Sequence, residues 1–206
     1  VHLIGGGGEA GPATRTPEVV LSQITSAGIT TVVGLLGTDS TTRHMESLLA
    51  KARGLEAEGV STYIYTGAYD VPVPSITGST RKDIIIVDKI VGTGEVAMSD
   101  HRSSQPSYEE YIKLSAETRL GGMLSGKAGV IVYHMGDGKR GMKHLFDMVA
   151  NSEIPIGQFI PTPVNRSESL LNEAIEWAKM GGYIAITSRI GGRLMPMDGI
   201  VHPAQA

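Results

Sequence analysis

The residues best suited to chemistry lie at the start of the chain, where a histidine precedes a run of glycines and an acid. His2 is followed by the four glycines 5–8 and then by Glu9. Glycines let a backbone turn sharply and approach a ligand closely. The imidazole could bind a metal, the loop could bind phosphate, or the stretch could be a simple flexible turn. The glycines lack the G-x-G-x-x-G spacing and the Lys-Ser/Thr pair of nucleotide-binding loops, which disfavours phosphate.

Further polar side chains recur along the chain, each directly after an apolar stretch. They are Thr38 and Asp39, Tyr69, Asp100, His101 and Arg102, His134 and Asp137, and Asn165 and Arg166. A single histidine in such a place is usually structural, but His2 and His134 occupy equivalent positions, which favours metal binding by the pair. Arg102 and Arg166 could form ordinary surface ion pairs, or they could bind a substrate that carries carboxylates. Tyr69 could pack in the core or stabilise a developing oxyanion.

The apolar stretches predict strands, and the amphipathic stretches between them predict helices. After a first strand that carries His2, we expect strands at residues 29–36, 60–66, 95–98, 129–133, 156–160 and 183–187. We expect helices at residues 16–28, 42–58, 82–91, 107–120, 139–149 and 167–180. Residues 84–87 alone could form a strand, but a strand at 95–98 favours the helix before it. Thr16 is the expected cap of the first helix, with Pro17 at its first position.

Strands that alternate with helices through short connections predict an α/β protein with a parallel sheet and helices outside it. An open doubly wound sheet and a (β/α) barrel both fit this pattern. In both folds, ligands bind at the carboxyl ends of the strands. Polar residues follow most of the expected strands rather than one switch point, which favours the barrel.

The composition limits the classes of function. The 206 residues suffice for one domain, and the net charge of −3 argues against a nucleic-acid partner. With no cysteine, a metal would have to be held by histidines and carboxylates. We find neither an apolar run long enough for a membrane span nor a signal peptide, so we expect a cytoplasmic protein without a membrane partner. The sequence starts with Val1 rather than Met, which indicates processing or a piece of a longer protein.

Several separate motifs follow one another along the chain. They are His2-Leu3-Ile4-Gly5-Gly6-Gly7-Gly8-Glu9-Ala10-Gly11, Gly34-Leu35-Leu36-Gly37-Thr38-Asp39-Ser40, Thr66-Gly67-Ala68-Tyr69, Ser99-Asp100-His101-Arg102-Ser103, His134-Met135-Gly136-Asp137 and Pro161-Thr162-x-Val164-Asn165-Arg166. Together, and in this order, they resemble the isoaspartyl dipeptidase family of the metal-dependent amidohydrolase superfamily. The resemblance spans nearly the whole chain.

The resemblance implies a (β/α)8 TIM barrel with two zinc ions at its mouth, which activate a hydroxide for hydrolysis of a β-aspartyl dipeptide. It makes His2 and His134 metal ligands and gives Tyr69 the task of polarising the scissile carbonyl. It also assigns residues that hold the substrate: Glu9 for the α-ammonium group, and Thr38, Arg102 and Arg166 for the carboxylates.

The chain also departs from the family pattern. Glu95 stands where the family has a bridging carboxylated lysine, and Pro163 stands where it has a further metal histidine. The first histidine of the family's His-x-His pair would precede Val1, and the metal aspartate, the last barrel strand and the small β domain would follow Ala206. We therefore expect residues 1–206 to be a barrel core that is incomplete at both ends and forms homo-oligomers.

The remaining metal ligands are His2, Glu95 and His134, a set that suits one zinc or none rather than two. We expect a metallo-dipeptidase whose activity is impaired in this chain. One alternative is a non-catalytic barrel remnant that binds acidic dipeptides or partner chains through Glu9, Arg102 and Arg166. Another is a different amidohydrolase reaction, of dihydroorotase or deacetylase type.

Overall fold

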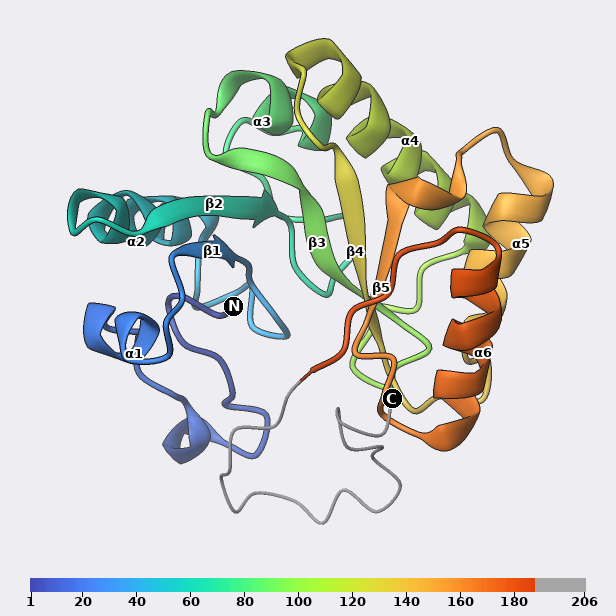
Figure 1. Ribbon diagram of the computed structural model, residues 1–206, viewed down its shortest axis with the longest axis horizontal. Coiled ribbons are helices and arrows are strands. Elements are labelled where there is room, and N and C mark those ends of the chain that lie inside the picture. Colours follow the sequence, from blue (N-terminus) through green and yellow to red (C-terminus); the bar gives the residue numbers. More distant parts are fainter. Residues whose placement is uncertain (188–206) are drawn as a thin grey trace.

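The computed structural model describes residues 1–187, in which parallel strands form one curled sheet (Figure 1). The strands are β1 (Thr31–Gly34), β2 (Ser61–Thr66), β3 (Ile90–Met98), β4 (Val130–Met135) and β5 (Phe159–Thr162). They pair in chain order, β1-β2-β3-β4-β5, and every pair is parallel. This arrangement is the α/β half-barrel that alternating strands and helices predict, although a closed eight-stranded barrel is not seen in the described residues.

Helices connect the strands and cover the convex side of the sheet (Figure 1). They are α2 (Met45–Ala57), α3 (Thr80–Ile86), α4 (Tyr108–Ser125), α5 (Lys143–Asn151) and α6 (Glu168–Lys179), and a short α1 (Leu21–Thr25) precedes β1. Two short 3-10 turns, Pro12–Thr14 and Ile156–Gln158, complete the elements of the described residues. None of the helices in residues 1–187 has the length and apolar character needed to cross a membrane.

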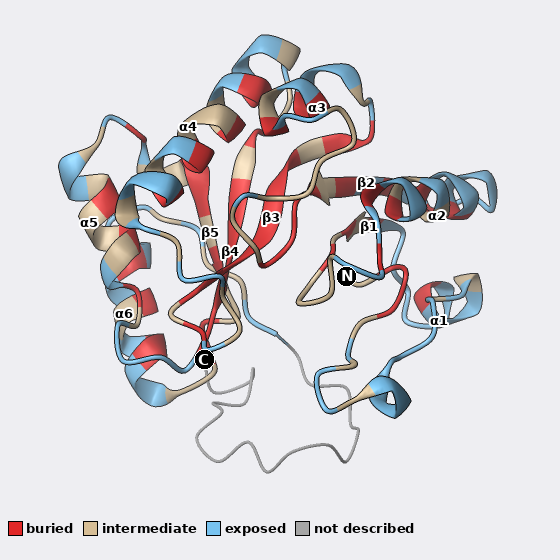
Figure 2. Cartoon of the chain, turned by 180° about the vertical axis from the view of Figure 1, so that it is seen from behind, coloured by how far each residue is buried: buried red, intermediate tan, exposed pale blue. Residues whose placement is uncertain are grey.

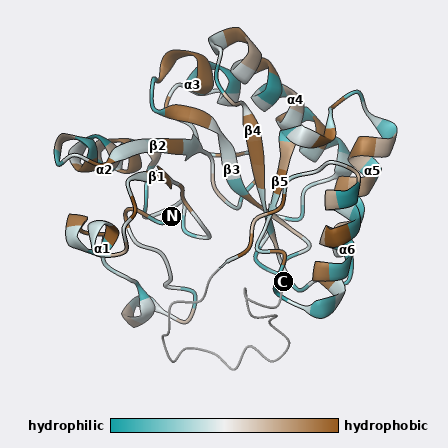
Figure 3. Cartoon of the chain, in the orientation of Figure 1, coloured by the Kyte–Doolittle hydropathy of each residue, from teal (hydrophilic) through white to brown (hydrophobic). Residues whose placement is uncertain are grey.

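The buried side chains form two hydrophobic clusters between the sheet and the helices (Figure 2). The first joins β1 and β2 to α1 and α2 and contains Leu3, Leu48 and Ile64. The second joins β3, β4 and β5 to α4, α5 and α6 and is centred on aromatic residues such as Trp177. Apolar residues concentrate on the strands, whereas hydrophilic residues are frequent on the helices and in the connecting loops (Figure 3).

The segments expected as the first and last strands are not strands, yet both hydrogen-bond to an edge of the sheet. The Val1 nitrogen donates to the Val33 carbonyl at 2.8 Å, and Leu35 N–H donates to the Val1 carbonyl at 3.1 Å. At the other edge, Ala185 N–H donates to the Pro161 carbonyl at 3.0 Å. The prediction of strands at His2 and at residues 183–187 was wrong, because each segment pairs over too few residues to form a ladder.

The first predicted helix starts later than expected, because its supposed cap is used elsewhere. Thr16 N–H donates to the Gly6 carbonyl at 2.9 Å, and the Thr16 hydroxyl accepts from Gly6 N–H at 2.7 Å. This pairing holds Thr16 against the glycine loop, and α1 begins only at Leu21. The helix predicted at 82–91 is likewise α3 followed by the start of β3, because Ile90 is fully buried and pairs with Ile64 of β2.

The buried faces of two helices are predicted only in part by the sequence. In α6 the sequence predicts one inward face of Leu171, Ala174, Ile175 and Ala178; the first two are buried, but Ile175 is 40% exposed and Trp177 is fully buried instead. In α4 the sequence predicts Tyr111, Leu114 and Leu120 inward; Leu120 faces outward, and the helix continues through Gly121 and Gly122, where the prediction ended it. Both glycines are buried because α4 lies close to α3 and to the start of β4.

Replacing Gly122 with alanine is expected to lower the free energy of unfolding by about 1–3 kcal/mol, measured by urea denaturation. An added Cβ would lie 2.4 Å from the Gly129 Cα, and neither backbone can move without disturbing the helix or the strand. Gly54→Ala is the matched control, because Gly54 lies in α2 with open space around it. That change is expected to stabilise the protein by about 0.5–1 kcal/mol. Equal effects of the two changes would contradict the close approach of α4.

Candidate active site

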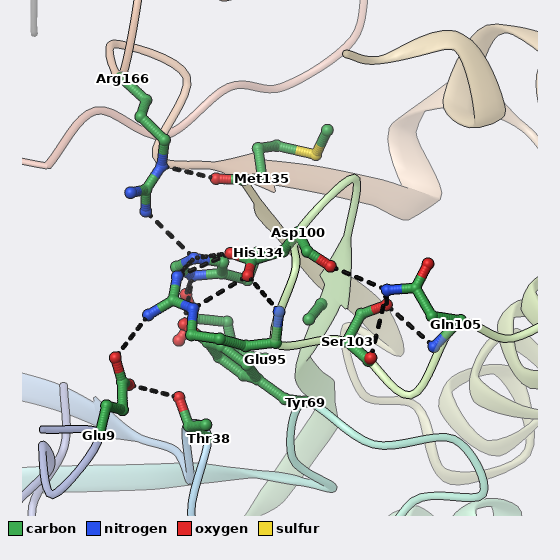
Figure 4. Close-up of polar contacts among 12 residues, drawn as sticks. Glu9, Thr38, Tyr69, Glu95, Asp100, Ser103, Gln105, His134, Met135 and Arg166 are labelled. Atoms are coloured by element: carbon green, nitrogen blue, oxygen red, sulfur yellow. Dashed lines mark hydrogen bonds and ion pairs between the residues drawn. The ribbon is translucent and has the colours of Figure 1, made fainter. Parts of the chain in front are cut away.

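All eight residues predicted as site residues meet at the carboxyl ends of the strands and form one connected set of contacts. Six of them are labelled in Figure 4: Glu9, Thr38, Tyr69, Glu95, His134 and Arg166. They come from the loop before α1, from the loops after β1, β2, β3 and β5, and from within β3 and β4. The residues are His2, Glu9, Thr38, Tyr69, Glu95, Arg102, His134 and Arg166. Parallel strands bring their carboxyl ends to one edge, which is why residues so distant in sequence converge.

His134 lies at the centre of the site and is 6% exposed. Its Nδ1 is 2.5 Å from the Glu95 Oε1 and 2.8 Å from the Tyr69 hydroxyl. Its Nε2 faces guanidinium nitrogens of Arg102 at 3.0 Å and Arg166 at 3.1 Å. Burial lowers the pKa of His134, but hydrogen bonds with Asp100 and Glu95 outweigh burial, so the pKa lies above its ordinary value.

Glu95 joins His134 to His2. It lies in β3, is 7% exposed, and places its Oε2 3.9 Å from the His2 Nε2. The His2 ring is wedged against the backbone, since a Cβ added to Gly37 would lie 2.6 Å from its Cε1. Burial lowers the pKa of His2, partly offset by the negative charge of Glu95. The His2 Nδ1 is buried and has no hydrogen-bond partner.

Arg102 is held in place by Asp100, a residue that the sequence did not single out as a site residue. Asp100 accepts from the Arg102 backbone N–H at 2.8 Å and from its Nε and one terminal nitrogen at 2.9 and 2.6 Å. The Asp100 side chain is 1% exposed, and the bonds from Arg102 and His134 hold its pKa well below the ordinary value despite burial. The sequence did contain a signal for this role, because Asp100 lies directly after a strand and two positions before Arg102.

Glu9 and Thr38 form the outer part of the site. Glu9 accepts from the Thr38 hydroxyl at 2.5 Å and from Arg102 at 2.9 Å (Figure 4). Burial raises the pKa of Glu9, but these two hydrogen bonds and the charge of Arg102 lower it by more than burial raises it. The pKa therefore lies below its ordinary value, and the carboxylate is charged at neutral pH. Beside it lies a hollow of about 380 Å³, which is lined by Gly7, Gly8, Glu9, Pro12, Arg15, Thr38 and Asp39.

Tyr69 is buried beside His134 and Arg102. It is 4% exposed, its ring centroid lies 4.6 Å from that of His134, and the Arg102 guanidinium carbon lies 5.3 Å from the Tyr69 centroid. Burial, together with the negative charge of Glu95, raises the pKa of its hydroxyl well above the ordinary value. Tyr69 therefore keeps its proton at neutral pH and remains a donor.

The donor atoms of His2, Glu95 and His134 fit one zinc ion by their chemistry, because two imidazoles and one carboxylate form a common catalytic zinc set. The unpartnered His2 Nδ1 leaves one imidazole nitrogen free of protein bonds. Within residues 1–187, however, no three such side chains are already arranged to hold an ion, and both nitrogens of His134 contact protein groups. Pro163 offers no ligand atom, so the described residues do not fit a pair of zinc ions.

The fold and the site define an α/β protein of barrel type whose polar cluster lies at the carboxyl ends of consecutive parallel strands, as in barrel enzymes. Two solved structures of β-aspartyl dipeptidase from Fervidobacterium islandicum AW-1 superimpose on it. The one in complex with a β-Asp-Leu dipeptide is 53% identical, with a TM-score of 0.90 over 91% of this chain and 51% of its own. The other is 50% identical, with a TM-score of 0.91 over 97% of this chain and 53% of its own.

The chain belongs to the β-aspartyl dipeptidase family, whose members are peptidases. It spans about half the length of these two solved relatives. No protein-family model matches it. The family resemblance seen in the sequence motifs is thereby confirmed.

Proposed function

We propose that this chain forms the dipeptide-binding part of a zinc-dependent peptidase that hydrolyses β-aspartyl dipeptides. The observation that carries the proposal is the single connected cluster in which Glu9, Tyr69, His134 and the two arginines converge. A relative that is 53% identical was solved with a β-Asp-Leu dipeptide.

The charges of the cluster complement those of such a dipeptide. A β-aspartyl dipeptide carries one ammonium group and two carboxylates, which match the carboxylate of Glu9 and the guanidinium groups of Arg102 and Arg166. In the structure, Glu9 and Arg102 bind each other at 2.9 Å. The dipeptide would replace this internal ion pair with two external ones, and the Thr38 hydroxyl would help to orient the bound end.

Hydrolysis requires water to attack the amide carbon while the carbonyl oxygen becomes negative. The protonated hydroxyl of Tyr69 would donate a hydrogen bond to that oxygen. His2, Glu95 and His134 would hold one zinc ion, which when bound acts as a Lewis acid and lowers the pKa of water. Because these three donors suit one zinc ion rather than the two that the family resemblance implies, and because both His134 nitrogens already contact protein groups, we infer that the 206-residue chain alone hydrolyses dipeptides slowly or not at all.

Binding without hydrolysis is the second candidate function, and one observation favours it. Glu95 and His134 contact each other directly at 2.5 Å, so two of the three proposed zinc donors already have a partner. The substrate groups Glu9, Arg102 and Arg166 are present whether or not a metal binds. A homo-oligomeric state, a cytoplasmic location and the lack of a nucleic-acid partner stay predictions from the sequence.

Calorimetric titration of the purified chain with β-Asp-Leu is expected to show binding, and α-Asp-Leu is expected to bind more weakly, since its carboxylates are spaced differently. Elemental analysis after dialysis against zinc is expected to give one ion per chain or none. Hydrolysis of β-Asp-Leu should be slow or absent and should disappear with a chelator. N-acetylglucosamine in the same assays tests the deacetylase-type alternative.

These measurements separate the two candidate functions. Binding with chelator-sensitive hydrolysis supports the peptidase, and binding without hydrolysis at any zinc concentration supports the binding remnant. Two zinc ions per chain would show that the donor assignment is wrong. A chain that binds neither dipeptide would refute both candidates.

A further inference from the structure

A buried arginine outside the cluster holds the glycine loop that carries His2 and Glu9. Arg43 lies in the turn before α2 and is 6% exposed. Its guanidinium group donates to the carbonyl oxygens of Gly6 at 2.9 Å, Ile4 at 3.3 Å and Gly7 at 3.4 Å. A buried cation must have polar partners, and here most of them are backbone carbonyls of one loop. The contacts of Arg43 thus fix backbone rather than bind a ligand.

Asp39 fixes the orientation of Arg43. Its Oδ2 accepts from Arg43 at 3.1 Å and from Arg15 at 2.8 Å. Its Oδ1 accepts the backbone N–H groups of Thr42 at 2.8 Å and Thr41 at 3.1 Å. Burial opposes ionisation, but the bonds from Thr42 and Arg15 hold the pKa of Asp39 well below its ordinary value. The carboxylate therefore stays charged and keeps the guanidinium group aimed at the loop.

The other side of the loop is held by Thr16, so the glycines lie between two supports. Gly6 exchanges hydrogen bonds with the backbone and side chain of Thr16 at 2.7 to 3.0 Å. A Cβ at Gly5, whose φ is +79°, would lie 2.2 Å from the Thr16 carbonyl oxygen. No larger residue fits there, and in this conformation the loop contacts both Thr16 and Arg43.

This loop conformation sets the positions of two site residues. A Cβ on Gly6 would lie 3.3 Å from the His2 ring, so the Gly6 backbone packs directly against the imidazole. Glu9 leaves the far end of the same loop to reach Arg102. We propose that Arg43 is a positioning residue that, through the glycine loop, places the His2 imidazole and the Glu9 carboxylate for a dipeptide. The part that concerns the dipeptide rests on the proposed function.

Lysine cannot replace Arg43 in this role. A guanidinium group presents five N–H donors in one plane, whereas an ammonium group presents three from a single nitrogen. The four acceptors of Arg43 are spread around that plane, so Arg43→Lys keeps the charge and loses most of the carbonyl contacts. The conservative variant therefore tests geometry rather than charge.

The test compares Arg43→Lys with Arg81→Lys in the full 206-residue chain. Arg81 forms a two-pronged ion pair with Glu117 on α3 and α4, so its loss controls for breaking an arginine pair elsewhere. NMR measures the imidazole signals of His2 and the amide exchange of Gly6, and calorimetry measures the Kd for β-Asp-Leu. Arg43→Lys is expected to shift the His2 signals and to raise both the Gly6 exchange rate and the Kd about 10-fold. Arg81→Lys is expected to change none of these readings.

Unchanged His2 signals and Gly6 exchange in Arg43→Lys would overturn the proposal, even if the variant were less stable. If the unaltered chain fails to bind β-Asp-Leu, the proposed function fails, while the NMR readings still decide the positioning role. If Arg43→Lys does not fold, Asp39→Asn tests the same support, because it leaves Arg43 in place without its charged partner. A shift of the His2 signals in Asp39→Asn would support the proposal, and none would contradict it.

Discussion

Replacing Arg102 with methionine is expected to weaken binding of β-Asp-Leu about 100-fold, measured as the Kd by calorimetry. The Arg102 side chain is 20% exposed and donates two hydrogen bonds to Asp100, which also accepts the Arg102 backbone N–H, so the guanidinium group is already oriented before a ligand arrives. Methionine fills a similar volume but offers no donor to a substrate carboxylate. It also leaves Glu9 and Asp100 without their shared counter-charge, which adds negative charge where the dipeptide's carboxylates would bind.

Arg53→Met is the matched control for this change. Arg53 pairs with Asp88 at 3.1 Å, and its side chain is 57% exposed. Its loss is expected to leave the Kd unchanged. A Kd for Arg102→Met within twofold of the unaltered chain would remove Arg102 from the dipeptide site.

Replacing Asp83 with alanine is expected to lower the free energy of unfolding by about 3–5 kcal/mol, measured by urea denaturation. Asp83 is fully buried in α3 and accepts from the Thr66 hydroxyl at 2.5 Å. It also accepts from the backbone N–H groups of Ile76 at 3.0 Å and Thr77 at 2.8 Å, and from the Thr77 hydroxyl at 2.7 Å. Alanine would remove the shared acceptor of these four donors, of which the Thr66 hydroxyl is buried and the other three are partly buried.

Asp88→Ala is the control, and it is expected to change the free energy of unfolding by no more than about 1 kcal/mol. The Asp88 side chain is 67% exposed, and exposed ion pairs contribute about 0–1 kcal/mol. A loss of less than about 1 kcal/mol for Asp83→Ala would mean that water replaces the lost bonds, contrary to the burial described for this carboxylate.

The parallel sheet and the edge that carries the site could be predicted from the sequence, because both depend on local patterns. Apolar β-branched runs marked β1, β2 and β4, and a polar residue directly after such a run necessarily lies at the carboxyl edge. The same logic placed Tyr69 and Arg166 near His134, although they come from different loops. Strand order and the direction of each connection then follow from short loops and the helices between the strands.

What the sequence did not reveal depends on contacts between distant segments. Thr16 has the features of a helix cap, but the glycine loop binds it, and no local pattern shows that competition. Trp177 replaces Ile175 as the inward residue because the indole fits between α5 and β5. Arg43 looks like an ordinary charged residue in sequence, and its role appears only once its partners are in place. Asp100 stood in a polar turn after a strand, but its contact with His134 depends on the fold.

The residues of the site come from segments that pack in both hydrophobic clusters of the fold. Thr38 and Tyr69 follow strands of the first cluster, whereas Glu95, His134 and Arg166 belong to strands of the second or follow them. The site thus draws its side chains from segments that pack in different hydrophobic clusters of one sheet. A ligand that contacted residues from both would bind only the folded sheet that brings them together, so by linkage its binding would stabilise that sheet against unfolding.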